Sequence, residues 1–144
     1  MGKKRIVKKE GTSVDQGLRA RSLSKAPKKR IAHGVLSVQS TYNNTIASLT
    51  DSEGKVLMWT SSGSLGFSGA KKGTPFAAAK VGELLAEKAL LMGLKSVDVV
   101  VRGVGSGRES AIRAFISKGI DISSIKDKTP VPHNGPRPRK PRRI

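Results

Sequence analysis

The chain has 144 residues, and its 28 Lys and Arg side chains against 10 Asp and Glu give a net charge of +18, which predicts a polyanionic partner. The length and the 36% apolar content fit one domain, and the absence of cysteine excludes disulfides, cysteine-based metal sites and thiol catalysis. No apolar run approaches the ~18 residues of a membrane span, so we expect a cytoplasmic protein that does not bind membranes.

The positive charge is concentrated at the two ends of the chain. Residues 1–30 carry 11 basic and 2 acidic side chains, residues 31–128 carry 12 and 8, and residues 129–144 carry 5 and none. We therefore predict a basic, flexible N-terminal extension over 1–30, a globular domain over 31–128 and a C-terminal tail over 129–144. Five of the seven prolines lie in the tail, which favours an extended track of cationic side chains.

The first half of the globular domain predicts a three-strand antiparallel meander. Segments rich in Val, Ile, Leu and Thr run over 34–41, 45–50 and 56–60, and the residues between them suit turns. A loop rich in glycine and serine follows over 61–73.

The second half predicts two helices that alternate with two strands. Thr74 is a typical N-cap with proline after it, and apolar residues then recur three and four apart until Gly93. A strand is predicted over 96–102, a helix opened by a capping box of Ser106 and Glu109, and a last strand over 120–125. Ala111, Ile112, Phe115 and Ile116 form the expected buried stripe of the second helix. The order β-β-β-α-β-α-β indicates a layered α/β domain.

The turn before the second helix is a candidate anion site. Gly103, Gly105 and Gly107 alternate between Arg102 and Arg108, and backbone N–H groups at such a helix start can face a phosphate. The spacing matches neither a P-loop nor the dinucleotide fingerprint. Phosphate contact and a purely structural role of the glycines in a tight turn are both open.

Two further segments have the composition of RNA contacts. Phe67, Lys71 and Lys72 lie in the flexible loop, where the ring can stack on a base or fill the core. Asn43 and Asn44 in the first turn can bind a ribose or phosphate or serve their own backbone. The five aromatic residues of the chain are too few for a stacking platform, so contact should be mainly to RNA backbone and shape.

Catalysis has little support in the sequence. The two histidines, His33 and His133, flank the basic ends, and no catalytic triad, carboxylate pair or metal-ligand spacing is present. We predict no enzymatic activity, no cofactor and no metal. Two alternatives remain: a nuclease that uses the glycine turn with Asp51 or Asp98, and a basic protein that compacts DNA.

Four ordered motifs resemble those of a known family. They are Tyr42-Asn-Asn-Thr-Ile46, Thr74-Pro-Phe-Ala-Ala78, Arg102-Gly-Val-Gly-Ser-Gly-Arg-Glu-Ser-Ala-Ile-Arg113 and Asp127-Lys-Thr-Pro-Val-Pro-His-Asn-Gly-Pro-Arg-Pro138. Together they resemble small-subunit ribosomal protein S eleven, in its bacterial or organellar form. The resemblance implies a ribonuclease-H-like topology without that enzyme's activity.

The resemblance also implies partners and a location on the ribosome, either cytoplasmic or organellar. Members of the family are structural constituents of the small ribosomal subunit that bind 16S-type ribosomal RNA on its platform. The seventh and eighteenth small-subunit proteins are the implied neighbours, and messenger RNA passes nearby at its exit and leader-pairing region. Family motifs and charge together predict these RNA-binding residues: Lys28, Lys29, Arg30, Asn43, Asn44, Phe67, Lys71, Lys72, Arg102, Gly103, Gly105, Gly107, Arg108, Arg113, His133, Asn134, Arg137, Arg139, Lys140, Arg142 and Arg143.

Overall fold

A computed structural model describes residues 17, 20, 21 and 29–143 of the chain. Five strands form one sheet in the order β3-β2-β1-β4-β5. The strands are β1 (His33–Ser40), β2 (Thr45–Thr50), β3 (Val56–Ser61), β4 (Ser96–Arg102) and β5 (Asp121–Asp127). This arrangement confirms the predicted α/β class and the three-strand meander.

Strand direction divides the sheet into two parts. β2 is antiparallel to both β1 and β3, whereas β1, β4 and β5 are parallel to one another. Leu36 on β1 pairs with Leu49 on β2 and with Val99 on β4, so the apolar side chains of neighbouring strands fall on the same face. The carboxyl ends of the three parallel strands therefore meet at one edge of the domain.

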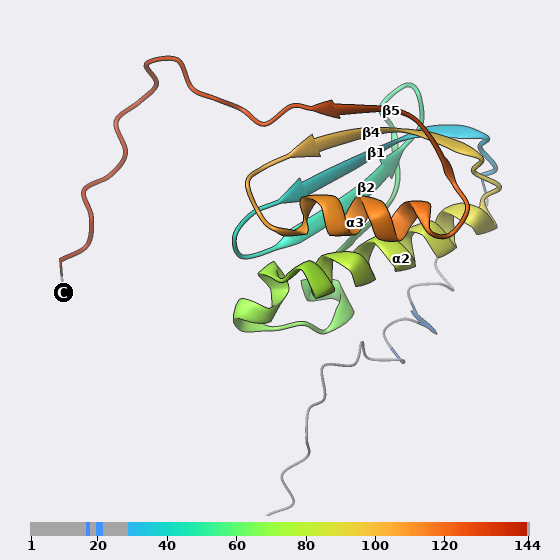
Figure 1. Cartoon of the computed structure of the whole chain (residues 1–144), viewed down its shortest axis with the longest axis horizontal. Coiled ribbons are helices and arrows are strands. Elements are labelled where there is room, and N and C mark those ends of the chain that lie inside the picture. The colour runs from blue at the N-terminus through green and yellow to red at the C-terminus, as the bar shows by residue number, and fades with distance from the viewer. Residues whose placement is uncertain (1–16, 18–19, 22–28, 144) are drawn as a thin grey trace, which may run out of the picture.

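Both helices cover this apolar face of the sheet (Figure 1). Helix α2 (Pro75–Leu91) packs against β2, β3 and the second helix, α3 (Gly107–Ile116), which also contacts β1 and β4. The core between the two layers consists of aliphatic side chains and one aromatic ring, that of the fully buried Phe115. None of the helices in the described part of the chain is long and apolar enough to cross a bilayer.

Helix α2 begins and ends where the sequence predicts. The Ala77 N–H donates to the Thr74 hydroxyl over 3.3 Å, and the chain leaves the helix through Gly93 at φ +80°. The loop before it contains two short 3₁₀ turns, η1 (Gly63–Leu65) and η2 (Gly69–Gly73), which the sequence did not indicate.

Helix α3 differs from its prediction in two details. The capping box is wrong because the Ser106 hydroxyl donates to the Gly73 carbonyl over 3.3 Å and makes no cap hydrogen bond, while Glu109 pairs with Arg113. The helix ends at Ile116, whose side chain is exposed, so the predicted buried stripe lacks its last member.

Candidate nucleic-acid interface

Three of the four segments with predicted RNA contacts follow the parallel strands. The hairpin tip (41–44) comes after β1, the glycine turn (103–107) after β4, and the tail (128–143) after β5. The fourth segment, the loop of η1 and η2, leads into the amino end of α2 beside them (Figure 1). The fold therefore gathers segments that lie up to about 90 positions apart at one end of the sheet. We call this end the strand-end surface.

The glycines of the turn permit it to lie directly on the hairpin tip. A Cβ at Gly103, which has φ +96°, would lie 2.1 Å from the Ser40 carbonyl oxygen, and one at Gly105 would lie 2.3 Å from that of Thr41. The Gly105 N–H donates to the Ser40 carbonyl over 3.0 Å, and the Gly103 N–H donates to the Thr129 hydroxyl over 3.2 Å. These two N–H groups are therefore not free for a phosphate, and the packing role of the glycines is the one the structure supports.

The loop of η1 and η2 also contacts the hairpin tip. A Cβ at Gly73 would lie 2.1 Å from the Tyr42 carbonyl oxygen, so only glycine permits this approach. The hydrogen bond from Ser106 to Gly73 joins the loop to the start of α3 as well. Hairpin tip, loop and glycine turn thus form one continuous piece of packed backbone.

Thr41 closes the turn of the hairpin tip. Its N–H donates to the Asn44 carbonyl over 2.8 Å, and its hydroxyl accepts from the Asn44 N–H over 3.1 Å. Asn43 is exposed, and the Asn44 side-chain oxygen is buried without a hydrogen-bond partner among the described residues. The turn is therefore held by threonine, which leaves the amide of Asn43 available to a ligand.

Asp127 fixes the place where the tail leaves the domain. Its carboxylate accepts from the Thr129 hydroxyl over 2.6 Å and from the Thr129 N–H over 2.9 Å, and Arg108 forms an ion pair with it. These bonds, those of Thr129 first, lower the pKa of Asp127 from 3.8 to about 2. The positive charge of Arg108 is thus partly neutralised by an ion pair within the domain.

The tail itself carries the largest group of predicted contacts. Every residue from Pro130 to Arg143 is exposed and lies outside helices and strands, and the segment runs away from the strand-end surface (Figure 1). The basic and polar side chains predicted to contact RNA there are all accessible to a partner: His133, Asn134, Arg137, Arg139, Lys140, Arg142 and Arg143.

Three other predicted contacts lie elsewhere. Lys29 and Arg30 precede β1 and so lie at the opposite end of the sheet, where the Lys29 ammonium pairs with Asp51 over 3.2 Å. Lys28 falls outside the described residues. Arg113 is on α3 and is highly exposed while it pairs with Glu109. The structure does not join these residues to the strand-end surface.

Comparison with known proteins identifies the family of the chain. The family model for ribosomal protein S11 matches residues 34–143. The chain is also 53% identical over 117 residues to small ribosomal subunit protein uS11 of Thermosipho melanesiensis, which covers 80% of this chain and 91% of the relative. The chain belongs to the ribosomal protein S11 family. It is therefore a structural, non-enzymatic protein of the small ribosomal subunit, and the nuclease alternative is excluded.

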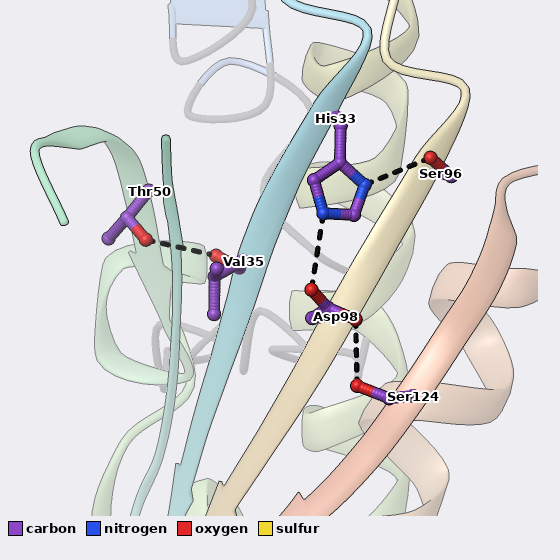
Figure 2. Close-up of polar contacts among 6 residues, drawn as sticks. All are labelled: His33, Val35, Thr50, Ser96, Asp98 and Ser124. Atoms are coloured by element: carbon purple, nitrogen blue, oxygen red, sulfur yellow. Dashed lines mark hydrogen bonds and ion pairs between the residues drawn. The ribbon is translucent and has the colours of Figure 1, made fainter. Parts of the chain in front are cut away.

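The two carboxylates considered for a nuclease serve the S11 fold itself. Figure 2 shows Asp98 between two strands, where it binds the His33 ring over 3.1 Å and accepts from the Ser124 hydroxyl over 2.7 Å. The bond from Ser124, followed by the contact with His33, lowers the pKa of Asp98. Asp51 accepts from two backbone N–H groups in its own turn, chiefly that of Lys55, which lowers its pKa.

Sequence reasoning missed two exposed aromatic residues at the strand-end surface, Tyr42 in the hairpin tip and Phe76 at the start of α2. Phe67 is half-buried and packs against the core, whereas the ring of Phe76 is 50% exposed beside it. Phe76 could have been found from helical spacing, because it lies outside the buried positions of α2 that begin at Ala77. Stacking of Phe67 on a base stays a prediction, and the structure makes Phe76 the more accessible ring.

Proposed function

We propose that this S11 protein binds small-subunit ribosomal RNA through the strand-end surface and the tail together. The observation that carries the proposal is the convergence of the hairpin tip, the loop, the glycine turn and the base of the tail at one end of the sheet. Lys71, Lys72 and Arg102 are exposed or half-exposed in these segments, whereas the ion pair with Asp127 partly neutralises Arg108. A polyanion is the partner that such a surface fits.

Shape and charge have separate parts in this binding. The packed backbone of the hairpin tip and glycine turn provides a rigid surface that fits folded RNA, and it offers few base-reading groups. The tail adds five cationic side chains and no acid, so it supplies affinity through phosphates. By family resemblance, the bound region is the platform of the subunit, beside the seventh and eighteenth small-subunit proteins and close to the exit path of messenger RNA.

A salt titration of the full chain with small-subunit ribosomal RNA tests the proposal. Each engaged phosphate contributes about −0.7 to −0.9 to the slope of log affinity against log salt. Replacement of the five tail Arg and Lys residues by glutamine should reduce the magnitude of the slope by up to about 4 and keep the length of the tail. The matched control replaces Lys55 and Lys95, which are exposed and immediately precede β3 and β4 at the opposite end of the sheet, and should change the slope little.

Two outcomes would contradict the proposal. A slope near zero for the unaltered chain would show that phosphates are not engaged. Equal competition by duplex DNA and by the ribosomal RNA at fixed salt would favour the DNA-compacting alternative, because charge alone does not distinguish the two.

A further inference from the structure

An apolar hollow lies between the loop of η1 and η2 and the start of α2, next to the strand-end surface. It has a volume of about 290 Å³ and is lined by Phe67, Lys71, Thr74 and Phe76. We propose that this hollow takes a single unstacked nucleobase of the bound RNA. The inference rests on the proposed RNA binding and adds to it a site and a kind of contact.

The two rings form the walls of the hollow. Their centroids are 6.1 Å apart and their planes meet at 85°, an edge-to-face packing that holds both rings in place. The inner ring, Phe67, is anchored against the core, and the outer ring, Phe76, is 50% exposed at the start of α2. A flat base that stacks on one ring meets the other at its edge, so the pair offers a preformed slot for a planar aromatic group.

The charges around the hollow favour a nucleotide over an apolar side chain. Lys71 lines it, and the Lys80 ammonium lies 5.6 Å from the centre of the Phe76 ring, on the next turn of α2. The one nearby carboxylate among the described contacts, Glu83, is bound by Lys80 over 2.9 Å. Because Glu83 offsets the charge of Lys80, Lys71 is the cationic side chain that a phosphate beside an inserted base would meet.

The lining does not read which base enters. The Thr74 hydroxyl donates its one proton to the Lys71 carbonyl over 2.7 Å and accepts from the Ala77 N–H, so it has no proton left for a base. The remaining lining is Lys71, whose flexible ammonium suits a phosphate, and the apolar surface of the two rings. Since every base has a stacking face, the site should accept any base that the RNA presents unstacked at this position.

The hollow is continuous with the strand-end surface. Gly73, at the end of the same loop, lies against the Tyr42 carbonyl of the hairpin tip and accepts from Ser106 at the start of α3. An RNA backbone that follows the strand-end surface therefore passes the opening of the hollow. This position favours a base of that RNA over a segment of a neighbouring protein.

The test compares variants of the full chain in binding to small-subunit ribosomal RNA at several salt concentrations. Phe76→Leu keeps an apolar side chain and the charge but removes the ring, and should lower affinity about 5-fold to 100-fold with an unchanged salt slope. Phe76→Tyr keeps the ring and should bind as the unaltered chain does. Trp59→Leu is the matched control, because Trp59 is also an exposed aromatic residue and lies on the sheet face away from the helices.

A second measurement uses only the unaltered chain and so does not depend on the folding of a variant. Ultraviolet cross-linking of the complex, followed by trypsin, should attach a nucleotide to the peptide 73–80, which contains Phe76. Cross-links confined to the tail would overturn the base site. So would equal affinities of the Phe76→Leu and Trp59→Leu variants.

The outcomes separate this inference from the proposed function. Failure of the unaltered chain to bind the RNA with a salt-dependent affinity would contradict the proposed function itself. Normal binding of Phe76→Leu to RNA, combined with weaker retention of a neighbouring protein in reconstituted subunits, would overturn only the base site and assign the hollow to a protein side chain.

Discussion

The close packing of the glycine turn on the hairpin tip makes Gly105→Ala a sharp test of the strand-end surface. An added Cβ would lie 2.3 Å from the Thr41 carbonyl oxygen and 2.4 Å from the Ser40 hydroxyl, so the turn must move away. Overpacking of this kind costs about 1–3 kcal/mol. The move also weakens the hydrogen bond from Gly105 to Ser40, and an unpaired buried donor costs a similar amount. We expect the free energy of unfolding to fall by about 2–4 kcal/mol.

Alanine substitutions at three other glycines separate the cost of a steric clash from the cost of a strained backbone angle. Gly63 has ordinary backbone angles, and its nearest neighbour in space would be 3.8 Å from an added Cβ, so Gly63→Ala should change stability by less than about 0.5 kcal/mol. Gly119 has φ +86° and open space around it, so Gly119→Ala should show the backbone strain alone, about 1–2 kcal/mol. Gly103 combines a positive φ with a clash, and its alanine variant should be the least stable of the four.

Urea unfolding followed by circular dichroism measures these differences, with the four variants at the same pH and salt. A Gly105→Ala variant as stable as Gly63→Ala would refute the reasoning, because the turn would then not be held against the hairpin. Where the variant still folds, RNA affinity should fall as well, since the shape of the strand-end surface depends on the same contact. Unchanged affinity in a destabilised but folded variant would show that RNA binds without this part of the surface.

Three further predictions concern single side chains. In urea unfolding across pH, Asp127→Asn should be less stable than the unaltered chain above pH 4, and the difference should vanish as the pH falls towards 2, because the folded carboxyl has its pKa lowered to about 2. Thr74→Ala should lower the free energy of unfolding by about 1 kcal/mol through loss of the N-cap, and Thr74→Ser should restore it. Lys88 is buried and desolvation lowers its pKa, so Lys88→Met should stabilise the protein at pH 7, with a gain that shrinks as the pH rises towards 10.5.

Local signals in the sequence predict α2 better than α3, for a physical reason. The N-cap of α2 is bonded within its own first turn, and its apolar residues face one continuous core, so spacing along the chain is sufficient evidence. At the start of α3, the Ser106 hydroxyl instead bonds to Gly73, a residue 33 positions away. A capping box is only a local pattern, and here a tertiary contact replaced it.

The candidate site follows the same division between local and distant information. Motifs and charge identified the candidate segments along the chain. The segments come together because β1, β4 and β5 are parallel, which places the carboxyl ends of these strands at one edge of the sheet. For Lys29, charge alone gave a misleading position. Its charge resembles that of the tail residues, but the fold places it at the opposite end of the sheet, where it pairs with Asp51. The difference in exposure between Phe67 and Phe76 also depends on packing that composition does not show.

The bonds of Asp127 to Thr129 and Arg108 fix the point at which the tail leaves the domain, and this limits the distance that the tail can reach. Pro130 to Arg143 is 14 residues long, and an extended, proline-rich chain advances about 3.1 Å per residue, so the tail can reach on the order of 40 Å from the strand-end surface. In the proposed binding mode, its arginines would act at a high effective concentration on RNA within that distance of the docked domain. The Asp127→Asn substitution should weaken binding less than removal of the tail charges, because the tail charges remain and Arg108 is released from its ion pair.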